Sequence, residues 1–562
     1  MELKKVVNIL FLLSSMFITF LTGLTHYDST NSPDFARYFY SYNTYFTGVN
    51  SQTGLEQGNL YYFLVSKSIS TGSNLILDFY INEYLNYKIQ LINFTLFSIG
   101  LLFLYFYLKE LGISFQLNML CLISLNFFLP LFSLRLIYKP EIFLFLLFCI
   151  SLYLIEKNFK TNETIYLYLL SLCAAIMLST KLVSAAILLF YLLLHFIFKS
   201  KYNFVKNYKK MIILFVIFFS IFSYENYLIN GVWFFNHNTP PEYSYKAEFN
   251  FLFNFDLKRL IFTPYQHNFN DSAWSIILLE TFDDYFHLYW NNDKSLFNVG
   301  QLKFGNLQFI VQYIGIAITF AFYCLIIFFS IFHKKDSLFL LSPFIGIFVM
   351  FSVSLFIQFN PDTGDQIKNY YYATLLVFAF IHLFKILSKY VNLKYLIILI
   401  VLQAFITSYI VGFPKEYSEN MELKLVDQII PTKFCTAYKN FVDFPVYEYP
   451  IEKDCINEKN FCRVSLSYNL SPEFRGGEWY IKFDKPLKKI SLQKDSDVIS
   501  VNDINGCLNK VNLGYNFINK TYEIKNSVPI FSVTFFIFLL FSGLLKEFLE
   551  IFSMRRKKLK NQ

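Results

Sequence analysis

The chain has 562 residues, of which 55% are hydrophobic and only 16% are charged, and its mean hydropathy is +0.41. Soluble domains carry about 25% charged residues, so this composition excludes a water-soluble globular protein. The formal net charge of +9 comes from basic residues that cluster at the ends of apolar segments, which argues against a nucleic-acid-binding protein and for contact with anionic lipid headgroups.

The apolar residues form uninterrupted blocks of roughly 17 to 25 residues, the length needed to cross the hydrocarbon core of a bilayer. An all-α polytopic membrane protein with about twelve transmembrane helices is therefore predicted. The expected spans are 6–24, 88–108, 114–134, 137–156, 164–180, 182–198, 211–229, 308–332, 337–358, 370–388, 395–413 and 529–549. The hairpin around Lys181 decides the side of every later loop. Its turn contains neither Gly nor Pro, and each of its arms is only just long enough to span.

Orientation follows from the Lys and Arg residues, which accumulate in short cytoplasmic loops. With a cytoplasmic N-terminus, the segments MELKK, KSKYNFVKNYKK and HKKD and the tail MRRKKLKNQ all lie inside, so both termini are expected in the cytoplasm of a cell-membrane protein. The N-terminal block could instead be a signal peptide, but it lacks an A-x-A cleavage site, which favours an uncleaved anchor.

The alternation of inner and outer loops that follows from this orientation defines three regions. We expect a transmembrane domain over 1–413 with outer loops 26–87 and 230–305, an extracytoplasmic domain over 414–528, and a final transmembrane helix with a basic cytoplasmic tail over 529–562. Function is expected on the outer side, because loops on a rigid scaffold usually carry it.

Two acids stand just outside the first span, in HYDSTNSPDFARY. A carboxylate there can meet a lipid-borne substrate at the membrane surface. The family resemblance described below implies a sugar on polyprenyl phosphate as this substrate. Such a sugar already has a good leaving group, so its transfer needs one base for the acceptor hydroxyl and cations for the departing phosphate. We predict that Asp34 is the general base, with Asp28 as its rival or helper.

Cations at the outer ends of the spans are the expected ligands of the donor phosphate: Lys368, Arg37, Lys139, Arg135 and Lys181. Lys368 is preferred, because PDTGDQIKNYYY brings it close to Asp365 and Tyr370, in a loop where the family resemblance described below implies donor binding. The alternative for each cation is a snorkelling anchor at a helix end.

The middle outer loop contains SAWSIILLETFDDYFHLYW, in which Glu280, Asp283 and His287 are spaced to share one helix face. They could line the acceptor site or bind a divalent metal, and the solvated face of an interfacial helix is the favoured alternative. No other cofactor is predicted. Three aromatic residues near the acids are possible platforms on which a sugar could stack: Tyr38, Tyr61 and Trp274. Packing is the simpler interpretation of each.

The last outer segment alternates polar and apolar residues in CRVSLSYNL and WYIKFDKPLKKISLQ, which predicts a small β-rich domain. It could cap the membrane domain or bind an acceptor or partner. Its even set of cysteines predicts two disulfides with three possible connectivities: Cys435, Cys455, Cys462 and Cys507. A metal site is the weaker alternative, since no C-x-x-C pair or nearby His accompanies them.

The first-loop acid, a following Tyr and the element LYY before the next helix resemble the start of the GT-C membrane glycosyltransferases, in the branch that includes protein O-mannosyltransferases and lipid A aminoarabinose transferases. RLIYKPEIFLFLLF, STKLVSAAILLFYLLL and PDTGDQIKNYYYATLLVF resemble later segments of that family, so the likeness covers about the first 390 residues. The chain departs from the family where Phe35 follows Asp34, and where Gln57, Gly58 and Asn59 replace His-Pro-Pro.

The resemblance implies an integral membrane glycosyltransferase that moves a sugar from a polyprenyl-phosphate-linked donor to an extracytoplasmic lipid, glycan or protein. The alternatives are a lipid-linked oligosaccharide polymerase or ligase, and a non-enzymatic lipid or sugar transporter. A transporter would show broken helices and buried charges within its spans, and neither is evident in the sequence. Walker and dinucleotide-binding motifs are absent.

Overall fold

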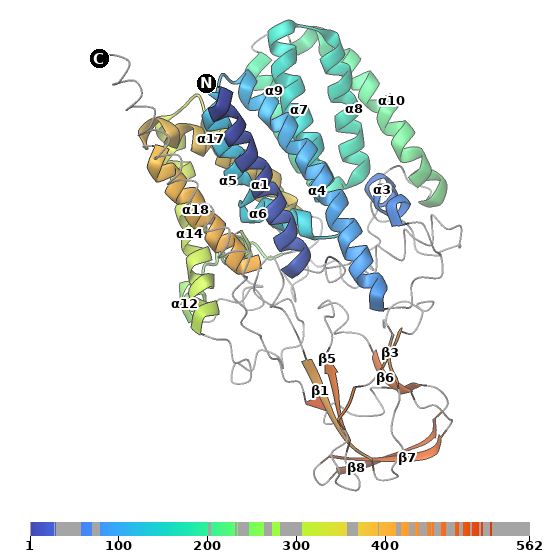
Figure 1. Cartoon of the computed structure of the whole chain (residues 1–562). Coiled ribbons are helices and arrows are strands. Elements are labelled where there is room, and N and C mark those ends of the chain that lie inside the picture. Colours follow the sequence, from blue (N-terminus) through green and yellow to red (C-terminus); the bar gives the residue numbers. More distant parts are fainter. Residues whose placement is uncertain are drawn as a thin grey trace.

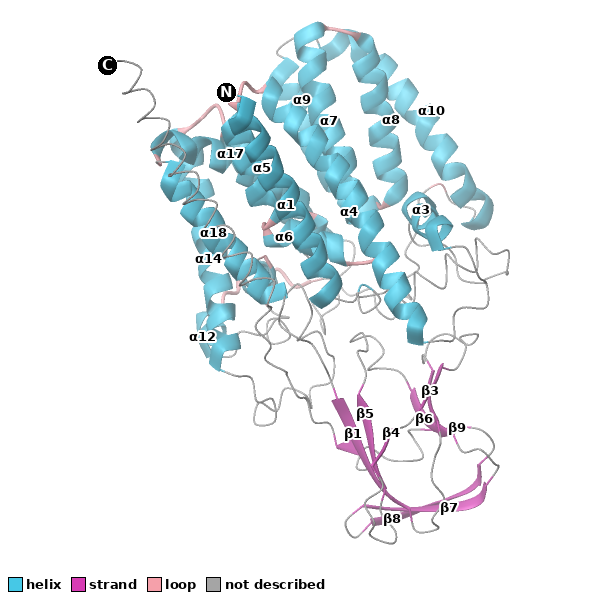
Figure 2. Ribbon diagram, viewed as in Figure 1, coloured by secondary structure: helices cyan, strands magenta, loops and turns pink. Residues whose placement is uncertain are grey.

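The computed structural model describes residues 2–26, 29, 58–69, 79–200, 204–230, 233, 247–262, 272–281, 306–356, 369–391 and 393–411, together with the backbone of strands between 418 and 519. The described part up to residue 411 is almost entirely helical, and Figures 1 and 2 show its long helices side by side in one bundle.

The longer helices are α1 (Glu2–His26), α4 (Phe79–Glu110), α5 (Phe115–Asn126), α7 (Glu141–Thr161), α8 (Thr164–Thr180), α9 (Leu182–Ser200), α10 (Phe204–Asn230), α14 (Asn306–Phe332), α16 (Ser342–Phe356), α17 (Ala373–Tyr390) and α18 (Leu393–Val411). Shorter ones connect them: α3 (Asn59–Ile69), α6 (Leu129–Leu136), α11 (Asn250–Phe253), α12 (Leu257–Phe262), α13 (Ala273–Glu280), α15 (Ser337–Leu340) and the 3₁₀ turn η7 (Asn369–Tyr371). Within the described chain, five helices are long and apolar enough to cross a membrane, or six if α5 and α6 form one bent span. These helices are compatible with a membrane protein.

Each apolar block predicted up to residue 413 coincides with a described helix or helix pair. The break at Lys181 is confirmed, because α8 ends at Thr180 and Lys181 has an extended backbone, with φ −159° and ψ 116°, before α9 begins. The twelve membrane crossings and their direction stay predictions, and the block 529–549 lies outside the described residues.

The third predicted span is not one continuous helix, contrary to expectation. The axes of α5 and α6 differ by 56°, and Pro130 stands in the first turn of α6, where a missing N–H costs little. Carbonyl groups freed by the break are bonded from other positions: Thr407 Oγ1 donates to the Phe127 oxygen at 2.6 Å, and Arg135 Nη2 to the Asn126 oxygen at 3.5 Å. These bonds satisfy backbone groups that an apolar interior would otherwise penalise.

Strands follow α18 in the chain: β1 (Ser418–Leu425), β2 (Lys433–Ala437), β3 (Tyr447–Pro450), β4 (Glu452–Asp454), β5 (Cys462–Ser467), β6 (Glu478–Lys482), β7 (Leu487–Lys494), β8 (Asp497–Ile504), β9 (Cys507–Asn509) and β10 (Ile518–Asn519). Their backbones pair in the orders β4-β5-β1-β7-β8, with β10 against β1, and β3-β2-β6-β9. That they form a separate extracytoplasmic domain stays a prediction.

The disulfides also stay a prediction. Cys435, Cys462 and Cys507 lie on β2, β5 and β9, where only the backbone is described, and Cys455 lies outside the described residues.

Two groups of buried polar side chains lie near the ends of the helices. One group lies where α6 and α8 end and α7, α9 and α17 begin, and the other lies where α4 and α7 end.

Candidate functional site

Lys139, Glu141, Lys181, Tyr370 and Tyr371 form the group that we call the cation cluster. Nζ of Lys181 makes a very short ion pair with Oε1 of Glu141. Both partners are buried, with 2% of Glu141 exposed. The second oxygen of Glu141, Oε2, is also buried, and no described residue donates a hydrogen bond to it.

Tyr370 links the two lysines of the cation cluster. Nζ of Lys139 donates to the Tyr370 hydroxyl at 3.3 Å and lies 4.9 Å from the centre of its ring. Nζ of Lys181 lies 5.2 Å from the Tyr370 ring centre and 4.9 Å from that of Tyr371. Aromatic faces attract cations more strongly when both are desolvated, so the tyrosines help to hold two like charges near each other.

The chain delivers these groups at helix ends. Pro140 caps α7 and makes Glu141 its first residue, where the helix dipole favours a carboxylate. Lys181 caps the C-terminus of α8, where the dipole favours a cation. The ion pair therefore joins two helix ends of opposite partial charge.

Asn93 on α4 fixes the segment that carries Lys139. Its Nδ2 donates to the carbonyl oxygens of Arg135, at 3.0 Å, and Ile137, at 2.8 Å. Its Oδ1 accepts from the Tyr61 hydroxyl at 2.9 Å. Tyr61 is fully buried, and its ring centre lies 6.0 Å from that of Tyr138. These contacts assign Tyr61 a packing role in this structure, the simpler of the two interpretations.

The other proposed sugar platforms have different surroundings. Trp274 lies edge-on to Phe351 with ring centres 5.5 Å apart, which is also a packing contact. Tyr38 lies outside the described residues.

Gly58, one of the departures from the family pattern, is where the chain meets the end of α8. Its N–H donates to the Thr180 carbonyl oxygen at 2.8 Å. A Cβ at this position would lie 1.8 Å from the Ser179 carbonyl oxygen, closer than any van der Waals contact. Only glycine allows this approach, so the residue helps to place α3 beside the cation cluster.

We expect Gly58→Ala to displace α3 and to lower the free energy of unfolding by about 3 kcal/mol, at the upper end of overpacking effects. Chemical unfolding in detergent measures this change. Gly112→Asn is the control, because a Cβ there meets nothing within 4 Å and Asn tolerates its left-handed backbone. Equal stability of the Gly58 variant and the wild type would contradict the close approach.

The structure brings Lys139 and Lys181 together and gives Arg135 other neighbours. The guanidinium of Arg135 lies 4.4 Å from the ring centres of both Phe97 and Phe132. Its Nη1 donates to Thr19 Oγ1 at 3.3 Å. Arg135 therefore belongs to the α5–α6 break, and no contact in the described part of the chain joins it to the cation cluster.

Four of the predicted catalytic and phosphate-binding residues lie outside the described residues: Asp28, Asp34, Arg37 and Lys368. Ser29, next to Asp28 in the chain, is described. Its N–H donates to Asn86 Oδ1 at 2.8 Å, and its hydroxyl donates to the Leu136 oxygen at 2.5 Å. The loop predicted to lie outside after the first span therefore begins beside the segment that leads to Lys139. The roles of Asp28 and Asp34 stay predictions.

The proposed acceptor or metal site cannot be followed in space. Helix α13 ends at Glu280, whose side chain lies outside the described residues, as do Asp283 and His287. In the part of the chain that is described, no three His, Cys, Asp or Glu side chains are grouped so that they could hold a metal ion.

Glu141 was assigned no role from the sequence, and it is the group that the structure adds. The available signal was an acid at the start of an apolar block, in YKPEIFLF. An ionisable residue within membrane-spanning sequence is a functional candidate by default, because its desolvation is costly.

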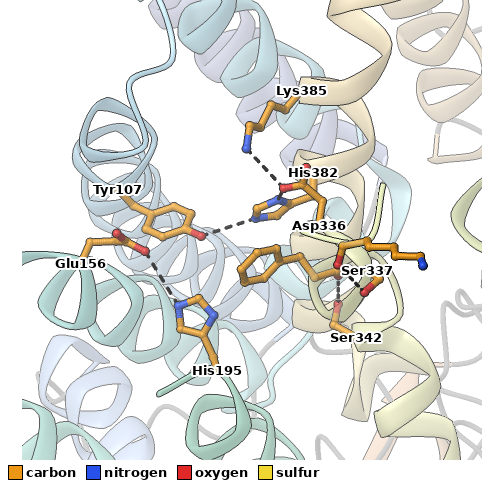
Figure 3. A network of polar contacts seen from close by, with 10 residues as sticks. Tyr107, Glu156, His195, Asp336, Ser337, Ser342, His382 and Lys385 are labelled. Atoms are coloured by element: carbon orange, nitrogen blue, oxygen red, sulfur yellow. Dashed lines mark hydrogen bonds and ion pairs between the residues drawn. The ribbon is translucent and has the colours of Figure 1, made fainter. Parts of the chain in front are cut away.

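A second polar group, which we call the histidine network, lies near the other end of the bundle (Figure 3). Its members are Tyr107, Glu156, His195, Asp336, His382 and Lys385. The Tyr107 hydroxyl lies 3.4 Å from His382 Nε2, and His382 Nδ1 lies 3.5 Å from Asp336 Oδ1. Lys385 Nζ lies 3.3 Å from the same carboxylate oxygen, and His195 Nε2 lies 3.9 Å from Glu156 Oε1.

Asp336 lies in the turn between α14 and α15, where it remains charged at neutral pH. The neighbouring imidazole of His382 lowers the pKa of its carboxyl group to about 2, and Lys385 acts in the same direction.

Comparisons of the chain with models of protein families, with curated proteins and with solved structures found no match. The chemistry of the site must therefore be argued from its own residues. The described members of the cation cluster carry two ammonium groups and one carboxylate in buried surroundings.

Proposed function

We propose that this protein is an integral membrane glycosyltransferase of GT-C type. It would take a sugar from a polyprenyl-phosphate-linked donor and pass it to an acceptor on the extracytoplasmic side, with both chain termini in the cytoplasm. The observation that carries the proposal is the buried cation cluster, in which Lys139 and Lys181 share Tyr370.

The charge of the cluster supports a phosphate ligand. Lys139 and Lys181 are both buried and both lie against Tyr370. A phosphate held by these ammonium groups would leave with its developing charge stabilised in a low-dielectric site.

The surroundings of the cluster support a lipid-linked donor over a soluble one. Directly after Lys181, α9 exposes a single apolar stripe: Leu182, Ala186, Phe190, Leu193 and Ile197. At 1.5 Å per residue the stripe is about 22 Å long, most of the thickness of a hydrocarbon core. An isoprenoid chain could follow this stripe while its phosphate remains at the lysines.

The proposed reaction needs one base and one anion site. Asp34 would accept the proton of the acceptor hydroxyl while that oxygen attacks the anomeric carbon of the sugar. The bond between the anomeric carbon and the phosphate oxygen would break, and polyprenyl phosphate would leave with the electron pair, held by Lys139 and Lys181. No general acid is required, in contrast to glycosidases, which expel an alcohol.

A transporter is the second candidate, because of one specific observation. The α5–α6 pair is bent by 56°, and Arg135 is buried beside the break without a carboxylate partner among the described residues. Broken helices with nearby charges are typical of transporters. A transporter would move the lipid-linked sugar without releasing its phosphate.

Transfer is tested by incubating the purified full-length protein with radiolabelled polyprenyl-phosphate sugars and a membrane extract. We expect label to appear in an acceptor, with polyprenyl phosphate released in equal amount. Heat-denatured protein is the control. Movement of intact labelled donor across a vesicle bilayer, with no release of polyprenyl phosphate, would instead favour the transporter.

A further inference from the structure

The helices that hold the cation cluster also carry the histidine network. At the end of the bundle near the cation cluster, α4 carries Asn93, α7 begins with Glu141, α9 follows Lys181, and α17 follows Tyr370 and Tyr371. Further along, the same helices carry members of the histidine network: Tyr107 on α4, Glu156 on α7, His195 on α9 and His382 on α17. Tyr107 follows Asn93, which fixes the segment carrying Lys139, by 14 residues. Glu156 follows Glu141 by 15 residues and His195 follows Lys181 by 14, which are separations of about 21 to 23 Å along a helix. Each of these helices is thus attached near both ends.

Contacts within the histidine network cross between these helices. The Tyr107 hydroxyl and His382 join α4 to α17 at 3.4 Å, and Glu156 and His195 join α7 to α9 at 3.9 Å. Figure 3 shows both contacts in one view.

Aromatic rings connect the two pairs. The Phe339 ring centre lies 5.2 Å from that of His195 and 4.4 Å from that of His382. The Phe378 ring centre lies 4.8 Å from that of His382 and 6.3 Å from that of His195. The network is therefore one continuous packed unit.

We infer that the histidine network positions the cation cluster, by fixing the spacing of α4, α7, α9 and α17 at the far end of the bundle. Buried polar networks have few satisfied arrangements, because an unpaired member is costly in a low dielectric. Helices transmit such a constraint along their length as rigid elements. Tyr107, Glu156, His195 and His382 are then positioning residues. The inference rests on the proposed function in one respect, which is the choice of undecaprenyl phosphate as the test ligand.

The test compares His382→Leu, which removes the contacts of the ring with Tyr107 and Asp336, with His382→Gln, which restores an amide near the position of Nε2. Hydrogen exchange of the ligand-free, full-length protein reports on the start of α7, where the N–H groups of Phe143 and Leu144 bond to the Pro140 oxygen. Binding of undecaprenyl phosphate reports on the intact cluster. We expect His382→Leu to accelerate exchange there and to weaken binding about 10-fold, within the usual range of coupling between sites, and His382→Gln to recover part of both.

Thr407→Val is the matched control, because it also removes a buried hydrogen bond, but that bond goes to the Phe127 oxygen at the end of α5 and does not join two of the four helices. Its exchange at the start of α7 and its binding should remain those of the wild type. If His382→Leu does not fold, Tyr107→Phe removes only the hydroxyl on the other side of the same contact. We expect this variant to shift exchange and binding in the same direction.

Two results would overturn the inference: unchanged exchange at the start of α7 in the His382 and Tyr107 variants, or an equal change in Thr407→Val. Failure of the proposed function gives a different result. The wild type would then not bind undecaprenyl phosphate at all, whereas the exchange difference between His382→Leu and Thr407→Val would persist.

Discussion

Replacing Lys181 by Met is expected to remove about 3–5 kcal/mol from the free energy of unfolding, because it leaves the buried carboxylate of Glu141 without its partner. The same variant should lose binding of the lipid-phosphate donor, since one of the two cluster cations is gone. Chemical unfolding in detergent measures the first effect, and titration with undecaprenyl phosphate measures the second.

The double variant Lys181→Met, Glu141→Leu separates these two effects. Replacing both partners of a buried ion pair is often neutral for stability, so the double variant should regain most of the lost stability and still fail to bind the donor. Lys160→Met is the control, because Lys160 pairs with Glu110 at 2.8 Å and is half exposed. An exposed pair contributes about 1 kcal/mol at most. Undiminished donor binding by the double variant would remove Lys181 from the phosphate site.

Replacing Asp34 by Asn is expected to reduce sugar transfer by at least about 100-fold, the lower end of what a general base contributes. Donor binding and stability should be unchanged, because Asn keeps the size of the side chain and the proposed phosphate site lies on other residues. The measurement is release of polyprenyl phosphate in the transfer assay, with donor binding recorded on the same preparation.

Asp28→Asn is the matched variant for this experiment. If Asp28 rather than Asp34 is the base, Asp28→Asn should lose sugar transfer and Asp34→Asn should retain it. Substantial transfer by both single variants would exclude a general base from this pair of acids. Loss of donor binding in Asp34→Asn would show that the residue acts in binding and would leave its role as a base unsupported.

Length and composition predicted the helices well. The apolar blocks coincide with described helices up to α18, and even the hairpin at Lys181 was found without a Gly or Pro to mark it. The reason is local, because a segment in hydrocarbon must satisfy its backbone groups within itself and exclude charge. Such a requirement can be recognised from the composition of consecutive residues alone.

The break between α5 and α6 was missed for the opposite reason. Pro130 alone is compatible with a continuous apolar block, and the break is stabilised by Thr407 and Arg135. Thr407 is 280 positions away from Phe127, whose carbonyl it bonds. A sequence contains no local sign of such a partner.

The sequence alone determined which segments are apolar helices and named Lys139 and Lys181 among several cations at helix ends. The tertiary structure decided that these two share Tyr370, that Lys181 pairs with Glu141, and that Arg135 lies elsewhere. The physical reason is that burial of a segment depends on its own composition, whereas the partner of a buried charge depends on which helix ends meet.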